Sequence, residues 1–287
     1  MVIDLHTHSD ASDGTRPPAE VMWSAQANGV NVLALTDHDT VDGWDEAIAA
    51  LPPGMTLVPG MELSCRSAGR SLHLLAYLFD PYEPELAAER ERIRDDRFHR
   101  AREMIDKLQE LGVPVSWEQV AGIAGQGAVG RPHIARAMVE TGVIRTVDEA
   151  FTATWIGPGG RAQVKRYALD PVRAVRLVTA AGGAAVLAHP RARKRGYVFG
   201  DGLIEELSGV GLAGVEVDHP DHDAADRTAL RGLAKGLGLI ITGASDDHGD
   251  LTGHRLGCET TSRDALEELL DLAHGFEPVQ GEEEDGR

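Results

Sequence analysis

The 287-residue sequence predicts an α/β fold, a β/α barrel of about seven strands interrupted by a mostly helical insertion. Short apolar runs alternate with helical patterns at both ends of the chain, which is typical of strands buried by helices. Between these parts, residues 83–165 show helical patterns and no strand-like run. Aromatic residues make up only 5%, so Ala, Val, Leu and Ile must build the core. We expect the barrel to comprise residues 1–82 and 166–276, the insertion 83–165, and an acidic, disordered tail 277–287.

The first half of the barrel is expected from four apolar runs and two helices. A pair of prolines opens the first helix and Gly29 ends it, as is usual at helix termini. The last two strands are joined by a short turn at residues 67–69, which predicts a β-hairpin. The expected strands are residues 2–5, 31–36, 56–63 and 72–78, and the expected helices are residues 18–28 and 44–51.

The helical insertion begins with a long, highly charged segment that Gly112 ends. Two shorter helical patterns follow, and a Gly-Pro-Gly-Gly linker at residues 157–160 leads back to the barrel. The α/β alternation then resumes to the end of the barrel. The expected elements are helices at residues 84–111, 131–141, 147–154, 171–181, 203–208, 224–237 and 264–273, and strands at residues 184–187, 214–217 and 239–242.

Composition limits the possible partners. The net charge of −18 argues against a broad face for long duplex nucleic acid. Part of that charge lies in the acidic tail, and bound metal would neutralise more of it, so a small anionic substrate remains compatible. No apolar run approaches the roughly 18 residues of a membrane span, and no signal peptide opens the chain. With only two cysteines and no C-x-x-C pair, we expect a soluble, cytoplasmic protein without membrane contact.

Histidines and carboxylates collect where the predicted strands end. His6 and His8 close the first strand, and residues two apart in an extended chain point to the same face. Two imidazoles presented together form half of a metal site. In a β/α barrel the strand ends meet at one rim, where the working residues lie. The other strand ends and adjoining loops supply Asp13, Asp37, His38, Glu62, His189, His219, His222, Asp246 and His248.

His73 lies near the start of its strand and therefore needs a separate explanation. If the hairpin turn centres near Ser67 and Ala68, Glu62 and His73 face each other across an antiparallel pair. Their side chains then share one face, whereas a slip of one residue would turn His73 to the other face. We expect His73 to join the metal site on this basis.

Taken together, these residues resemble the polymerase and histidinol phosphatase (PHP) superfamily over nearly the whole chain. The resemblance implies a distorted (β/α)₇ barrel that holds a trinuclear metal site. It rests on His6-x-His8, Asp13, Thr36-Asp37-His38, Glu62, His73, His189-Pro190 and Ser245-Asp246-x-His248.

The resemblance also implies which side chains bind which metal. The first metal would be bound by His6, His8, Glu62 and Asp246, the second by Asp13, His38 and His248, and the third by Glu62, His73 and His189, with Glu62 bridging. Nitrogen and oxygen ligands suit two or three divalent ions such as Mn²⁺, Fe²⁺ or Zn²⁺. A hydroxide bridged by the metals would attack the phosphoester. Asp37, beside the ligand His38, would orient that ligand or accept a proton.

The insertion narrows the substrate class. Arg131 and His133 stand at a helix entrance, and Arg161, Lys165 and Arg166 lie where the insertion rejoins the barrel. Arginine side chains and helix N-termini suit phosphate oxygens. The Gly-Arg-Pro-His motif resembles small bacterial phosphoesterases that remove the 3′-phosphate of nucleoside 3′,5′-bisphosphates such as pAp, with relatives that trim short 5′-phosphorylated RNA.

By that resemblance several residues would hold the substrate phosphates, and Lys165 departs from the usual apolar or proline residue at its position. The expected substrate-binding residues are Arg131, His133, Lys165, Arg166, His219 and His222, and the expected catalytic residues are Asp37, His38, Arg131 and His219. Three alternatives stay open: a general nucleotide or histidinol-phosphate phosphatase, a polymerase-associated module, and a non-enzymatic, metal-stabilised binding protein. The oligomeric state cannot be predicted.

Overall fold

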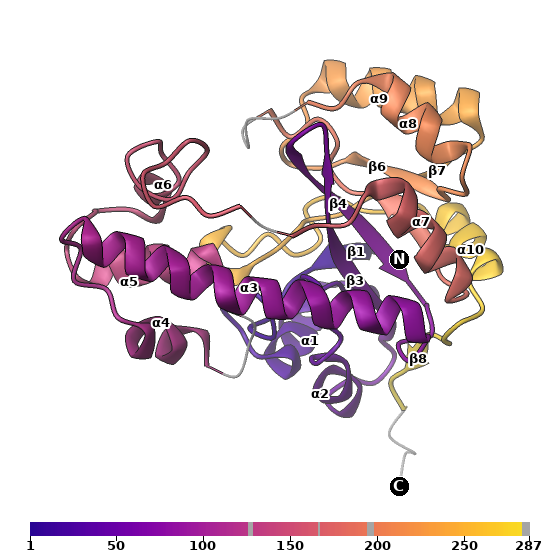
Figure 1. Cartoon of the computed structure of the whole chain (residues 1–287). Coiled ribbons are helices and arrows are strands. Elements are labelled where there is room, and N and C mark those ends of the chain that lie inside the picture. Colours follow the sequence, from indigo (N-terminus) through magenta and orange to yellow (C-terminus); the bar gives the residue numbers. More distant parts are fainter. Residues whose placement is uncertain (126–128, 166, 194–197, 283–287) are drawn as a thin grey trace, which may run out of the picture.

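The computed structural model describes residues 1–125, 129–165, 167–193 and 198–282. Seven strands follow one another in chain order around a single barrel-like sheet (Figure 1). All are buried along most of their length, which explains their near-continuous apolar sequences. The strands are β1 (Ile3–Thr7), β2 (Val32–Leu35), β3 (Thr56–Ser67), β4 (Arg70–Tyr77), β5 (Ala184–Leu187), β6 (Gly214–Asp218) and β7 (Ile240–Gly243).

The direction of β4 distinguishes this sheet from a regular β/α barrel. β4 runs antiparallel to both β3 and β5, whereas the other neighbouring strands in the series are parallel. The long strand β3 pairs with β2 through its first residues and with β4 through its second half. Between β1 and the segment that follows β7 the described residues show a single bridge, Thr7 to Asp247, so the barrel is nearly closed. The predicted distorted seven-stranded barrel is confirmed.

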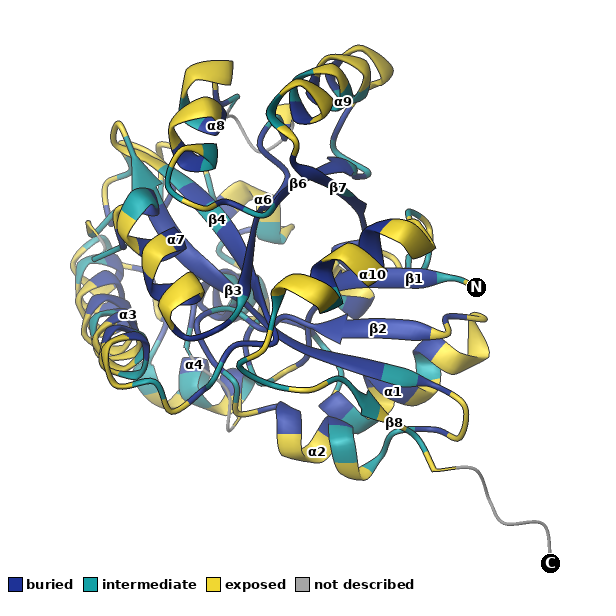
Figure 2. Ribbon diagram, turned by 90° about the vertical axis from the view of Figure 1, so that its right-hand side faces the viewer, coloured by how far each residue is buried: buried dark blue, intermediate teal, exposed yellow. Residues whose placement is uncertain are grey.

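In the described parts of the barrel, six helices and one 3₁₀ turn accompany the strands. Figure 2 shows dark-blue strands inside and yellow, exposed helix faces outside. For example, α9 begins where the Asp223 side chain accepts a hydrogen bond from the Asp226 backbone and ends at Gly238, which has a left-handed φ of 67°. The elements are α1 (Pro18–Ala27), α2 (Trp44–Ala49), α7 (Pro171–Ala180), α8 (Asp201–Ser208), α9 (Ala224–Leu237), η2 (Gly249–Leu251) and α10 (Arg263–Leu272).

The inserted stretch is helical and has an apolar core of its own. Its helices are α3 (Pro84–Glu110), α4 (Trp117–Ala124), α5 (Arg131–Glu140) and α6 (Val147–Ala150). Figure 1 shows α3 as one long helix, with α4, α5 and α6 gathered at its far end. Met104, Ile105 and Leu108 of α3 pack there against Ile134 and Met138 of α5. The helix expected at residues 147–154 is shorter than predicted, because α6 ends at Ala150.

The predicted register of the hairpin is wrong. Ser64, and not Glu62, lies opposite His73, because the hairpin turn is centred on Ala68 and Gly69. Both turn residues have positive φ, as a two-residue hairpin turn requires. The pairing is displaced by two residues, so His73 keeps the predicted face.

The tail expected to be disordered from residue 277 contains β8 (Val279–Gln280), which pairs with Thr56 and Leu57 of β3. This pairing forms because the start of β3 is an open edge of the sheet, and its free backbone groups can bond to the returning chain. Residues 283–287 of that tail lie outside the described residues.

Candidate metal and phosphate site

The strand ends bring the nine predicted metal ligands together at one rim of the barrel. His6 lies in β1 and His8 follows it, with their Nε2 atoms 3.1 Å apart. Glu62 of β3 is the central carboxylate, and His73 of β4 lies 2.7 Å from it (Nδ1 to Oε1). Since β4 runs antiparallel, its first half reaches the same rim as the ends of its neighbours.

Three groups of side chains have donor atoms within 4.8 Å of one another. The groups are His6, His8, Glu62 and Asp246; His8, Asp13, His38 and His248; and His38, Glu62 and His73. The first group equals the set predicted for the first metal. The second group contains the set predicted for the second metal, with His8 in addition. The third contains His38, while His189 lies beside the same carboxylate, its Nε2 3.1 Å from Glu62 Oε1.

The donor atoms fit divalent metal ions. His38 Nδ1 lies 3.1 Å from Glu62 Oε2, and His73 Nδ1 is closer still to Oε1. Yet neither of these buried nitrogens makes a hydrogen bond among the described residues. Donor atoms that lie this close together without pointing at one another are what ligands of one cation present. Imidazole and carboxylate donors without thiolate suit Mn²⁺, Fe²⁺ or Zn²⁺.

The protein's own charges favour positive charge at the centre of this cluster. Burial lowers the pKa of His8, but the adjacent Asp246 and Glu62 carboxylates outweigh it and raise that pKa to about 10. Burial raises the pKa of Glu62, and the surrounding histidines hold it well below its usual range. Metal binding releases such protons, so divalent ions would satisfy the same carboxylates.

A second layer of polar residues holds the predicted ligands in place. Asp37 accepts hydrogen bonds from the backbone and hydroxyl of Ser9 (2.8 and 2.6 Å) and from the Ser12 hydroxyl (2.6 Å), so it shapes the loop that leads to Asp13. The backbone N–H of Asp221 donates to His219 Nδ1, which leaves Nε2 as the donor to Asp246 Oδ2 at 3.2 Å.

Glu216 of β6 is a site residue that the sequence reasoning missed. It is fully buried and its carboxylate contacts both His6 and His189. Its only sequence signal is a carboxylate in the middle of an otherwise apolar strand, Gly-Val-Glu-Val. Burial raises the pKa of Glu216, but His6 and His219 outweigh burial and lower it.

The predicted substrate-binding residues lie in different environments. Arg131 and His133 open α5, and His133 is buried. Lys165 is exposed, and Arg166 lies outside the described residues. His222 donates from Nδ1 to Val217 O (2.9 Å) and accepts at Nε2 from the Arg191 backbone (3.1 Å), so both its ring nitrogens are bonded to the backbone.

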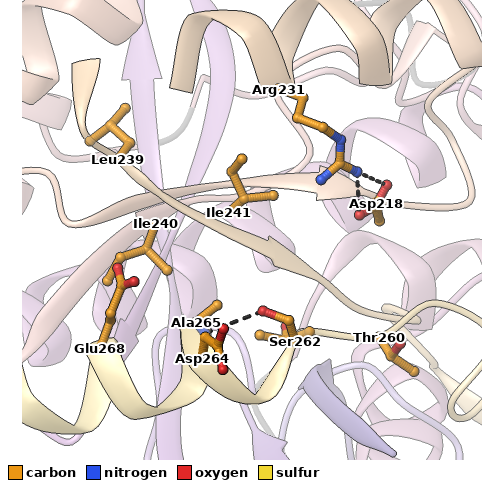
Figure 3. A pocket seen from close by; sticks show the side chains of 11 residues that line it. Asp218, Arg231, Leu239, Ile240, Ile241, Thr260, Ser262, Asp264, Ala265 and Glu268 are labelled. Carbon is orange, nitrogen blue, oxygen red and sulfur yellow. Dashed lines mark hydrogen bonds and ion pairs between the residues drawn. The ribbon is translucent and has the colours of Figure 1, made fainter. Parts of the chain in front are cut away.

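A separate pocket lies on the outside of the barrel between α9, β7 and α10 (Figure 3). Arg231 and Asp218 form an ion pair on one side of it, at 2.6 Å. None of the predicted ligands is among the described residues that line it. The pocket is therefore distinct from the histidine-rich rim.

A nearly closed barrel with buried, converging histidines and carboxylates at one rim defines the class of metal-dependent barrel hydrolases. The sequence model of the PHP domain matches residues 4–92. A 5′-3′ exoribonuclease of Haemophilus influenzae is 37% identical over 246 residues, covering 85% of this chain and 89% of that protein. A 3′,5′-nucleoside bisphosphate phosphatase of Chromobacterium violaceum is 33% identical, covering 88% of this chain and 89% of that protein.

Comparison with solved structures supports the same family. A Bifidobacterium adolescentis protein, provisionally described as a metal-dependent phosphoesterase, superimposes with a TM-score of 0.88 at 30% identity, covering 94% of this chain and 96% of that one. The chain belongs to the PHP family of metal-dependent phosphoesterases. Among its described residues, no helix is both long and apolar enough to cross a membrane.

Proposed function

We propose that this phosphoesterase removes the 3′-phosphate of nucleoside 3′,5′-bisphosphates, converting pAp to AMP. The observation that carries the proposal is Arg131, a half-buried guanidinium at the N-terminus of α5. It forms no ion pair with a carboxylate among the described residues, and it lies over the Phe151 ring at 5.3 Å. Burial and the nearby Arg97 lower the pKa of Arg131. A phosphate dianion would supply the missing negative charge.

His133 supports a second contact to the substrate. Its Nδ1 accepts a hydrogen bond from the Gly130 backbone at 3.0 Å, so in the neutral ring Nε2 carries the proton. Burial lowers the pKa of His133, while the charge of Asp13, one of the proposed metal ligands, acts on the ring in the opposite sense. A neutral Nε2–H donor beside the metal site would bind a phosphate oxygen. Lys165, Arg166 and Arg161 remain candidates for a peripheral phosphate.

The proposed metal ligands are those of the three groups together with His189. When bound, divalent ions would polarise the phosphoryl group and lower the pKa of a water molecule. Asp37 would hold the Asp13 loop. For His219 we propose that it orients Asp246, because its Nε2–H already donates there. We do not retain His222 as a substrate contact, since its ring nitrogens are both bonded to the backbone.

Trimming of short RNA from a 5′-phosphorylated end is the second candidate. It is favoured by the 37% identity to the Haemophilus influenzae exoribonuclease. The same metal groups and the same cationic α5 entrance would serve a phosphodiester of a short, single-stranded oligonucleotide. The net charge of −18 disfavours long duplexes.

The test is to measure product release from pAp, AMP, histidinol phosphate and a short 5′-phosphorylated RNA, each with Mn²⁺ and after chelation. We expect metal-dependent release of phosphate from pAp, with AMP as the nucleotide product. Faster release of mononucleotides from the RNA would favour the second candidate. Failure to hydrolyse any of the four with metal present would overturn both.

A further inference from the structure

We propose that Glu216 is a positioning residue that fixes His6 and His189 as metal ligands from behind. This inference rests on the metal-binding role proposed above for those two histidines. It concerns a residue that makes no contact with the substrate, so its test is a metal-binding measurement.

The two oxygens of Glu216 serve two different partners. Oε1 lies 3.1 Å from His6 Nδ1, and Oε2 accepts a hydrogen bond from the His189 backbone N–H at 2.8 Å. Glu216, His6 and His189 are all fully buried, so water cannot replace either bond. One carboxylate on β6 thus links residues from β1 and from the end of β5.

The bond to His6 decides which of its nitrogens can bind metal. A carboxylate only accepts, so in the neutral ring, the form that binds metal, Nδ1 carries the proton and Nε2 is left with a lone pair. That lone pair points to the cluster, since Nε2 lies 3.3 Å from Glu62 and 3.4 Å from Asp246. A ligand histidine commonly donates its other nitrogen to a carboxylate in this way.

The bond to His189 acts on the backbone. His189 has a φ of 26°, a conformation that residues other than glycine rarely adopt. Such a conformation persists only where its surroundings hold it. The short bond from its N–H to Glu216 is one such restraint, and it sets where the His189 ring meets Glu62.

Glu216→Gln tests this arrangement because it keeps the shape and removes one acceptor. If the amide oxygen accepts from His189, the amide NH₂ faces His6 Nδ1 and forces the proton onto Nε2. If the amide is turned round, its NH₂ group faces the backbone N–H of His189, and two donors meet without an acceptor. Either way one of the two ligands is lost or displaced, although the volume of the side chain is unchanged.

The experiment measures the dissociation constants of Mn²⁺ and Zn²⁺ for the full chain. Removal of a partner behind a metal ligand typically weakens metal binding by about 10- to 100-fold. We expect a loss of that size in Glu216→Gln. Asp218→Asn is the matched control, because Asp218 lies on the same strand but pairs with Arg231. Equal affinities in wild type and Glu216→Gln would overturn the proposal.

Two further measurements separate positioning from a general structural role. Glu216→Gln should lower the Tm of the metal-loaded protein more than that of the apo protein, so the metal-induced rise in Tm should be smaller in the variant. An equal fall in Tm with and without metal would contradict the proposal that Glu216 positions the metal ligands. In metal-loaded wild type, nitrogen NMR should find the His6 proton on Nδ1, and a proton on Nε2 would overturn the inference even if the variant fails to fold. Neither result depends on which phosphoester is hydrolysed.

Discussion

Arg97 of α3 donates a hydrogen bond to Asp39, the residue that directly follows the proposed ligand His38. The same guanidinium reaches the Ser64 hydroxyl at 3.0 Å, on the strand that carries Glu62. Both members of the pair are buried. The insertion is thus attached to the barrel beside the candidate metal site, and this attachment sets how α3 lies over the rim.

Removing one member of this pair should destabilise the protein. Arg97→Met leaves Asp39 buried and without its cation, which we expect to lower the free energy of unfolding by about 3–5 kcal/mol. Urea denaturation of the apo protein measures it. The control is Arg263→Met, because Arg263 forms an exposed pair with Glu267 and its loss should change little. A similar, small effect for both variants would refute the structural importance of the buried pair.

His8→Ala should abolish hydrolysis, because His8 belongs to two of the three donor groups. Metal ions supply several kcal/mol of transition-state stabilisation, so we expect a fall in kcat of about 10³-fold or more. Elemental analysis should show less bound metal. The matched variant is His254→Ala, since His254 is exposed and pairs with Asp250 outside the site. Normal turnover in His8→Ala would rule out the metal mechanism.

Arg131→Ala should impair the hydrolysis of pAp more than that of p-nitrophenyl phosphate, which has a single phosphate. Loss of a hydrogen bond to a charged group costs about 1.5–3 kcal/mol, which corresponds to about a 10- to 100-fold loss in kcat/KM. The exposed Arg145 of the same insertion, changed to Ala, serves as the control, because no role in binding is proposed for it. If Arg131→Ala slows both substrates equally, Arg131 is structural or contacts only the reacting phosphate.

Replacing glycine by alanine should have opposite effects on stability in the β3–β4 turn and in helix α4. Gly69 has a φ of 79°, so Gly69→Ala should destabilise the hairpin by about 1 kcal/mol. Gly122 lies within α4, and a Cβ there would meet no atom within 4 Å. Gly122→Ala should therefore stabilise by about 0.5–1 kcal/mol. Thermal denaturation of both variants checks the signs, and a stabilising Gly69→Ala would contradict the left-handed turn.

The location of the site could be predicted because most of its histidines and carboxylates stand at the end of an apolar run or in the loop that follows it. Thr36-Asp37-His38 shows this clearly, since β2 ends at Leu35. The register of the β3–β4 hairpin, by contrast, could not be predicted from the sequence. The residues Ser67, Ala68 and Gly69 allow two turn positions, and the choice depends on how β3 and β4 pair along their whole length.

Other features depend on contacts between distant parts of the chain. The role of Glu216 becomes visible only when β1, β5 and β6 are assembled, since its partners are His6 and His189. Arg97 looks like one of many charges on α3 until its partner Asp39 is known. β8 pairs with β3 over two residues only, which is too short for a periodic sequence pattern.

The bridge between β1 and the end of β7 has a consequence for synthesis of the protein. His8 N donates to Asp247 O and Asp246 N donates to His6 O, each at 2.9 Å, so the first strand meets a segment that leaves the ribosome much later. A nascent chain that already carries His6, His8 and Glu62 still lacks Asp246 and His248. The complete cluster therefore forms only on chains that extend beyond His248, and translation products that end before Asp246 cannot assemble it.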